Sequence, residues 1–185
     1  MSGPRIRPGS RAEVGRVIWG FSRIAGLVSG TRPPALFLVL GRHRRLFWGW
    51  LRFAGRLMPG GKLPRRESEL VILRTAHLRD CAYEFTHHVR LGRRAGLGRE
   101  DIRRIQEGPD APGWGPRERA LLAAVDQLED KRDLDEAAWK RLREHLDEPA
   151  TIEFLLLVGH YQMLATTIGT LRLEPDPRRG GRPRG

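Results

Sequence analysis

With 185 residues, the chain is long enough to bury one sizeable core, and its length argues against two domains. A hydrophobic fraction of 39% and a charged fraction of 30% are typical of a soluble globular protein, and a single cysteine excludes a framework of intramolecular disulfides. No uninterrupted apolar run reaches the roughly 18 residues that span a bilayer, so we expect a cytoplasmic protein without a membrane span.

The net charge of +12 is concentrated at the two ends of the chain. Residues 1–66 hold 14 basic residues and one acidic residue, residues 67–176 hold 16 basic and 21 acidic residues, and the tail from 177 adds four arginines. Only three of the 34 basic residues are lysines. Because such a dominance of arginine can follow from genomic base composition, the charge does not by itself predict a nucleic-acid partner, and we expect none.

Apolar residues recur with helical spacing along almost the whole chain. The helices that this spacing predicts are residues 13–28, 43–58, 65–78, 81–94, 99–106, 116–130, 134–146 and 148–173. Pro33 and Pro34 end the first helix, since paired prolines cannot continue one. Asp80 is expected to cap the fourth helix and Gly96 to end it. There is no alternating strand pattern and no repeat, so the predicted fold class is all-α.

The two ends of the chain differ from the part between them. Residues 1–12 and 175–185 are rich in Pro, Gly and Arg, and we expect both to be disordered. Residues 13–174 then form a single helical domain. The helix of residues 148–173 is apolar on more than one face, which is unusual at the surface of a monomer. We therefore expect a homo-oligomer, and the alternative is a central helix within a monomeric bundle.

The segment RDCAYEFTHH, residues 79–88, contains the only cysteine, together with a carboxylate, a phenol and two imidazoles. At about 100° per residue, Cys81, Glu84 and His88 fall within an arc of roughly 60° on one helix face. Glu84 and His88 are i,i+4 neighbours that can form a hydrogen bond, and a position in the first helical turn favours a thiolate at Cys81. This is a geometry for proton relay. His87 points about 100° away from His88 and is not expected to share its role.

Each of these residues also has a purely structural interpretation. A lone cysteine in a helix is most often a small buried apolar group, and Glu84 with His88 could form a solvated pair. Tyr83 and Phe85 suit a hydrophobic core. The spacing of Cys81, Glu84 and His88 is not usual for zinc, so no metal is expected.

Two segments of the sequence resemble a known superfamily. Residues 63–102, which begin LPRRESELVILRTAHL and end GREDI, resemble the carboxymuconolactone decarboxylase and AhpD-like alkylhydroperoxidase superfamily. Residues 151–176 resemble the matching C-terminal helix of its members. The resemblance implies an AhpD-like helical bundle, with its core motif at residues 63–102, that assembles as a trimer or hexamer.

The resemblance also implies a set of site residues. In the peroxidase branch, a glutamate precedes a C-x-x-C pair by twelve residues, and a histidine follows the second cysteine by four. This chain has Glu69, Cys81 and His88 at these positions, with Glu84 in place of the second cysteine, so an intramolecular disulfide cycle is excluded. Glu84 with His88 is instead similar to the decarboxylase branch, which tends to carry a glutamate and a histidine four apart. The chain most resembles the subgroup with the signature C-x-Y-E-[WF]-x-x-H.

Two enzyme classes follow from these observations. The first performs cofactor-free acid–base chemistry, a decarboxylation or a proton transfer, on a small carboxylated lactone or keto acid. In it, His88 oriented by Glu84 is the general acid and base, and Glu69 is a second proton carrier. Cys81 is then a nucleophile or a wall of the pocket. The alternative is a one-cysteine AhpD-like peroxidase, in which Cys81 is oxidised to a sulfenic acid and reduced by an external thiol.

Two further features of the sequence could bind a partner or a ligand. Residues 41–56 mix arginines with four aromatic residues, a composition that could bind a nucleic acid or an anionic membrane surface. We favour an amphipathic helix with its aromatics in the core. His160 and Tyr161 on the last helix could line the pocket, although a core histidine with satisfied hydrogen bonds is the simpler interpretation.

Overall fold

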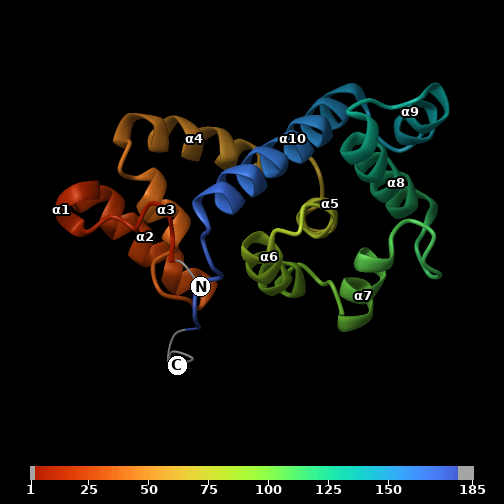
Figure 1. Ribbon diagram of the computed structural model, residues 1–185. Helices are drawn as coiled ribbons and strands as arrows, with labels where there is room; N and C mark the ends of the chain where they lie inside the picture. Colours follow the sequence, from red (N-terminus) through yellow and green to blue (C-terminus); the bar gives the residue numbers. More distant parts are fainter. Residues whose placement is uncertain (1–2, 179–185) are drawn as a thin grey trace.

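The computed structural model describes residues 3–178, which form ten helices and no strand (Figure 1). The helices are α1 (Arg11–Val14), α2 (Arg16–Ser29), α3 (Ala35–Leu40), α4 (Arg44–Leu57), α5 (Arg65–Leu78), α6 (Ala82–Arg94), α7 (Arg99–Glu107), α8 (Pro116–Lys131), α9 (Glu136–Arg143) and α10 (Glu148–Leu171). The all-α prediction is confirmed, and the one extended pairing within the described residues is an isolated bridge between Thr31 and Arg178.

Helix α5 is the centre of the fold. It packs against α6, α7, α8 and α10, and every residue from Ser68 to Ala76 is buried. A helix that is covered all round has no solvent face, and this explains why α5 shows little segregation of polar from apolar positions. The buried stretch includes Glu69, so a carboxylate lies inside the main hydrophobic core.

Helix α10 crosses the whole molecule, from the end near α8 and α9 to the N-terminal helices (Figure 1). The Asp147 side chain caps it by accepting a hydrogen bond from the backbone N–H of Ala150. By length and composition, α10 is the one helix among the described residues that could cross a membrane, although the core helix of a soluble protein meets the same criterion. The sequence predicts no membrane span because no uninterrupted apolar run reaches roughly 18 residues. Helix α10 contains no run of that length, because polar residues interrupt it.

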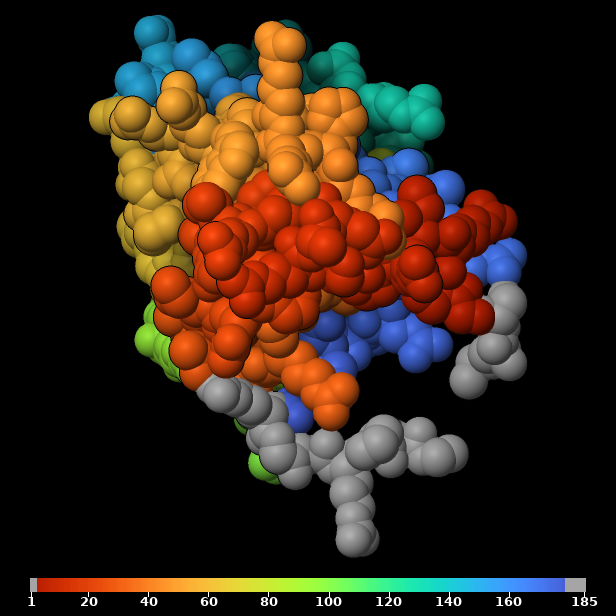
Figure 2. Space-filling view, turned by 90° about the vertical axis from the view of Figure 1, so that its left-hand side faces the viewer, coloured from red at the N-terminus to blue at the C-terminus, as the bar shows by residue number. Residues whose placement is uncertain are grey.

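Helices α1 to α4 form a second, smaller core against the side of the bundle. Val14, Ile18, Leu38 and Phe47 are buried in it. Figure 2 shows that residues of the N-terminal third cover most of this side of the molecule. The single helix expected over residues 13–28 is broken at Gly15, whose φ of 86° lies in a region that favours glycine. The six-residue helix α3 was not anticipated.

The ends of the helices around the candidate site differ in part from the predictions. Gly96 has a φ of 95° and follows α6, so its predicted role in ending that helix is confirmed. Asp80 does not cap α6: its φ of 49° places it in the turn before the helix, and Cys81 occupies the N-cap position.

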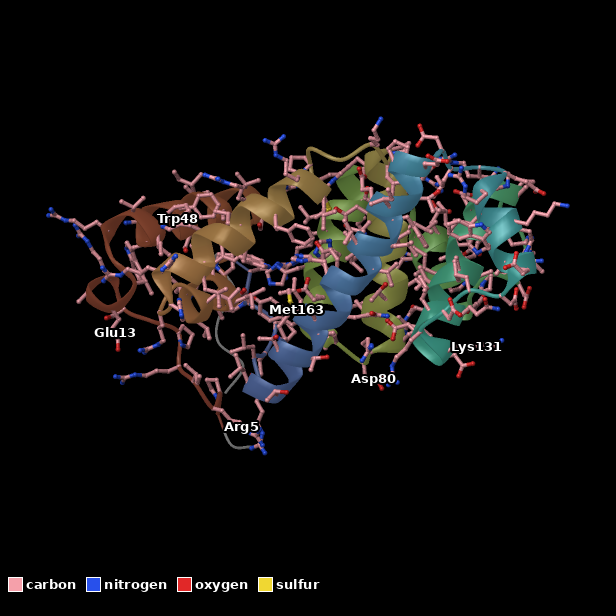
Figure 3. The ribbon with its side chains drawn as sticks, turned by 90° about the horizontal axis from the view of Figure 1, so that it is seen from above. Arg5, Glu13, Trp48, Asp80, Lys131 and Met163 are labelled. Atoms are coloured by element: carbon pink, nitrogen blue, oxygen red, sulfur yellow. The ribbon has the colours of Figure 1, made fainter. Side chains whose placement is uncertain are left out.

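Both termini lie against the bundle where the structure describes them, in contrast to the disorder expected for residues 1–12 and 175–185. The backbone N–H of Arg5 donates to the carbonyl of Leu171, beside the C-terminal end of α10 (Figure 3). At the other end of the chain, Asp176 is buried. The disorder expected for residues 1–2 and 179–185 falls outside the described residues.

Candidate active site

A cavity of about 450 Å³ lies between α2, α3 and α4 on one side and α6 and α10 on the other. Aromatic and aliphatic side chains form most of its wall. The residues with polar groups in the lining include Tyr83, Glu84, His87, His88, His160 and Tyr161. A mainly apolar cavity with a few convergent polar groups is the usual form of a small-molecule site.

His88 joins two carboxylates from different helices. Its Nδ1 lies 2.7 Å from Glu69 Oε2 on α5, and its Nε2 lies 3.2 Å from Glu84 Oε2, one turn earlier on α6. All three side chains are buried, but only Glu84 and His88 line the cavity. The three residues therefore form a line that runs from the cavity wall into the core.

Helices α5 and α6 also pack closely at Gly92, one helical turn after His88. A Cβ placed at Gly92 would come within 2.9 Å of the end of the Leu97 side chain and 3.6 Å of the Cβ of Glu69. The first distance would require the flexible Leu97 side chain to shift, and the second is ordinary van der Waals contact. The contact between Glu69 and His88 therefore lies in a closely packed part of the interface between the two helices.

Arg65 balances the charge of the buried line. Arg65 is the first residue of α5, and its guanidinium lies 2.6 Å from Glu69 Oε1. The Arg65 side chain is partly exposed to solvent, whereas that of Glu69 is not. Two carboxylates buried together are costly unless cations accompany them. With Arg65 and a protonated His88, the four side chains carry no net charge.

The charge state of His88 follows from its surroundings. Burial is the largest single effect and disfavours the imidazolium, but the attraction and hydrogen bonds of Glu69 and Glu84 outweigh it and raise the pKa of His88 to about 9. At neutral pH, His88 is therefore protonated and donates from both ring nitrogens. This differs from the expected role of His88 as the base, since an imidazolium has no free lone pair to accept a proton.

Cys81 is close to this line in the sequence but apart from it in space. It is buried at the N-cap of α6 and belongs to the main hydrophobic core, and it does not line the cavity. Burial raises the pKa of the Cys81 thiol, and the negative charge of Glu84 adds to the rise, while the backbone N–H groups of Glu84 and Tyr83 oppose it. The expected stabilisation of a thiolate by the helix N-terminus is therefore present but outweighed.

A second polar wall is built around the C-terminal segment. The hydroxyl of Tyr83 donates to Asp176 Oδ2 at 2.6 Å, and His87 Nε2 lies 3.1 Å from the same oxygen. Asp176 also accepts from the backbone N–H of Ala35 at the start of α3. Burial, followed by the charge of Asp176, raises the pKa of Tyr83 above its ordinary value, so this phenol keeps its proton.

Comparison with known proteins relates this site to a known family. The model of the carboxymuconolactone decarboxylase family matches residues 44–127, from α4 to α8, and so includes Glu69, Cys81, Glu84 and His88. Residues 44–127 are thus similar to the carboxymuconolactone decarboxylase family, and the chain shares the fold of AhpD-like proteins. No curated protein matches the chain in sequence.

Solved structures of AhpD-like proteins share the fold at low sequence identity. A peroxidase-related protein with an AhpD core from Ralstonia eutropha is 18% identical, with a TM-score of 0.82 over 95% of this chain and 93% of its own. A protein of unknown function from Agrobacterium tumefaciens is 21% identical, with a TM-score of 0.65 over 70% of this chain and 89% of its own.

A third similar structure is that of an enzyme with a named activity. The debrominase Bmp8 is 16% identical, with a TM-score of 0.79 over 92% of this chain and 91% of its own. A Bmp8 variant with one cysteine replaced by alanine was solved in complex with 2,3,4-tribromopyrrole.

The structure thus brings the predicted site residues together in part. Glu69, Glu84 and His88 form one hydrogen-bonded line, whereas Cys81 lies in the core beside it. Among residues 3–178, no group of His, Cys, Asp and Glu side chains has an arrangement that would hold a metal ion. The contact of Asp176 with Tyr83 and His87, two residues of the cavity wall, was missed, because no pattern in the sequence connects residue 176 with α6.

Proposed function

We propose that the protein catalyses proton transfer at a carbon atom next to a carbonyl group, with Glu84 as the base. Glu84 lines the cavity, and its carboxylate accepts a hydrogen bond from the His88 imidazolium. A carboxylate can take a proton from a carbon acid while a fixed cation beside it stabilises the charges that develop. His88 and Glu69 hold Glu84 in place, and Glu84 then returns a proton, its own or one exchanged with solvent, to the carbon of the enolate and becomes a carboxylate again. The reaction moves a proton and no electrons, so it requires no redox cofactor.

The lining of the cavity supports a small, uncharged ketone or lactone as the substrate. Most of the wall is aromatic or aliphatic, and among the described residues that line it none is an arginine or a lysine. The imidazolium of His88 already donates from both ring nitrogens to Glu69 and Glu84, so a carboxylated substrate would lose its hydration without gaining an ion pair. Deprotonation and decarboxylation pass through the same enolate, and the lining favours deprotonation. The ring compound bound to the Bmp8 variant supports a flat, compact ligand for this fold.

The single observation that carries the proposal is the Glu84–His88 pair at the cavity wall. It is tested by deuterium incorporation into small ketones and lactones, acetophenone and cyclohexanone among them, in deuterium oxide near neutral pH. The protein should accelerate exchange of the hydrogens next to the carbonyl. Glu84→Gln should lower this exchange by about 10²- to 10⁴-fold, as expected for removal of a general base.

A matched control separates chemistry from folding. Glu67→Gln changes a carboxylate on α5 that binds Arg117 outside the cavity, and it should leave the exchange rate unchanged. Equal rates for Glu84→Gln and the unaltered protein would remove Glu84 from the mechanism. Equal losses in both variants would assign the effect to stability.

A second candidate function is a one-cysteine peroxidase, favoured by the two backbone N–H groups beside Cys81 and by the likeness to the peroxidase-related protein. In this reaction the Cys81 thiolate attacks a peroxide oxygen, the O–O bond breaks, and water or an alcohol leaves as the sulfenic acid forms. Two equivalents of an external thiol then restore the thiol and release one disulfide. Sustained consumption of hydrogen peroxide with dithiothreitol, lost in Cys81→Ser, would establish this activity in place of the first.

A further inference from the structure

Two ring nitrogen atoms in the wall of the cavity have neither a hydrogen-bond partner nor an ion-pair partner among the described residues. Trp50 Nε1 on α4 and His160 Nδ1 on α10 are both buried and unpaired. The two rings lie nearly parallel, with centroids 6.2 Å apart and an angle of 16° between their planes. Both residues line the same cavity as Glu84 and His88.

Unpaired buried donors are rare in folded proteins because they lose water and gain nothing in return. The tryptophan N–H can only donate, so it requires an acceptor. Burial is the largest effect on His160 and lowers its pKa, which leaves a neutral ring with one N–H group and one acceptor nitrogen. The sequence also allows a second interpretation of His160, a core histidine with satisfied hydrogen bonds. This interpretation does not hold for Nδ1, which has no hydrogen-bond partner among the described residues.

The place of these two nitrogens relative to the proposed base gives them a role. Tyr161 contacts His160 with ring centroids 5.3 Å apart and contacts His88 with centroids 5.0 Å apart. One aromatic ring therefore separates His160 from the Glu84–His88 pair. A ligand in the cavity is in contact with a wall that contains both groups.

We propose that Trp50 and His160 form a subsite that binds the carbonyl oxygen of the substrate. Trp50 Nε1–H and the Nδ1–H tautomer of His160 both donate to this oxygen. The inference rests on the proposed function: as Glu84 takes the proton from the neighbouring carbon, negative charge moves to the oxygen and strengthens both hydrogen bonds. The substrate class is thus a small ring compound with a carbonyl acceptor next to an acidic C–H bond.

The subsite is tested by binding two probes of the same shape. Acetophenone carries the carbonyl group, and ethylbenzene replaces it with a methylene. Isothermal titration should show that Trp50→Phe, which keeps a ring and removes the N–H, weakens acetophenone binding by about 3- to 10-fold. Binding of ethylbenzene should not change. His160→Phe should act in the same way.

A control on the same helix isolates the N–H group. Trp48 makes ring contacts with Phe21 and Phe47 but does not line the cavity, so Trp48→Phe should leave both affinities unchanged. Equal weakening of both probes by Trp50→Phe would overturn the subsite, because it would reflect packing alone. As a second measurement on the unaltered protein, the indole N–H resonance of Trp50 should shift with acetophenone and not with ethylbenzene. Absence of that difference would also overturn it.

The subsite and the proposed function can fail separately. Glu84→Gln should lower deuterium exchange by about 10²- to 10⁴-fold while keeping the contribution of Trp50 to acetophenone binding. If the protein binds acetophenone through Trp50 but does not accelerate exchange, the subsite stands and the base is wrong. If exchange depends on Glu84 but not on Trp50 or His160, the base stands and the subsite is wrong.

Discussion

His88 Nδ1 lies 2.7 Å from Oε2 of Glu69, a carboxylate with no solvent exposure. The two residues are 19 positions apart and come from α5 and α6. Because Glu69 is the largest source of attraction for the imidazolium, it sets the charge state of the residue that contacts Glu84 in the cavity. A residue outside the cavity thus sets the charge state of one that lines it.

Replacing Glu69 with glutamine should lower the pKa of His88 from about 9 towards its ordinary value of 6.5. The amide keeps the size of the side chain and removes its charge. The measurement is an NMR titration of the His88 ring protons. Glu67→Gln, on the same helix, should leave the titration unchanged. An unaltered pKa in Glu69→Gln would show that Glu84 alone holds the proton.

The raised pKa of His88 also predicts how stability depends on pH. The folded value of about 9 lies above the unfolded value of 6.5, so the stabilisation is complete below pH 6.5 and is lost as the pH rises through 9. The loss is on the order of 3 kcal/mol, because each tenfold change in proton affinity corresponds to about 1.4 kcal/mol. Urea unfolding of the unaltered protein and of His88→Gln over this range would measure it. A constant difference between the two proteins would contradict the prediction.

The sequence predicts most of the fold because α4, α6, α7 and α9 carry a clear apolar stripe, and because α5, α8 and α10 are long enough to be recognised as helices although their apolar residues are less segregated. It does not predict α3, whose sequence ALFLVL is apolar throughout and too short to show a period. In the site, the spacing of Glu84 and His88 predicts their contact. The Glu69 contact was accessible only through the family resemblance. The pairing of Trp50 with His160 depends on tertiary packing, so no local pattern in the sequence indicates it.

Cys81 should behave as a buried thiol of ordinary or low reactivity. Burial raises its pKa, so iodoacetamide should alkylate the folded protein far more slowly than the same protein in urea. The chain has one cysteine, and a single rate therefore reports on this site. Cys81→Ala should cost about 1 kcal/mol of unfolding free energy through lost burial and leave deuterium exchange intact. Fast alkylation of the folded protein would instead favour the peroxidase.

Asp176 should stabilise the fold although it lies in a segment that the composition marks as disordered. Asp176→Ala leaves the Tyr83 hydroxyl and the Ala35 N–H without their acceptor. Each lost partner of a buried group costs about 1–3 kcal/mol, and thermal unfolding would show the loss. Glu174→Ala, an exposed position two residues earlier, is the control and should change little. Equal melting temperatures for the two variants would mean that the segment is not bound in solution.

The outward face of α10 should bind a second copy of the chain. The exposed positions that form this stripe are Ile152, Leu156, Gly159, Met163, Thr166 and Thr170. Their spacing alternates between four and three residues, the pattern of helices that pack side by side, and none carries a charge. A groove of about 800 Å³ beside the stripe lies between Met163 and α4 (Figure 3).

We propose that two α10 helices pack together along this stripe, since an uncharged face on an arginine-rich molecule suits a like surface better than solvent or a charged partner. Leu156→Lys should lower the mass measured by light scattering to that of the 21.1 kDa monomer. Ile24→Lys, an exposed apolar position on α2 outside the stripe, should leave the mass of the assembly unchanged. A monomeric unaltered protein, or dissociation by both variants alike, would rule out α10 as the interface.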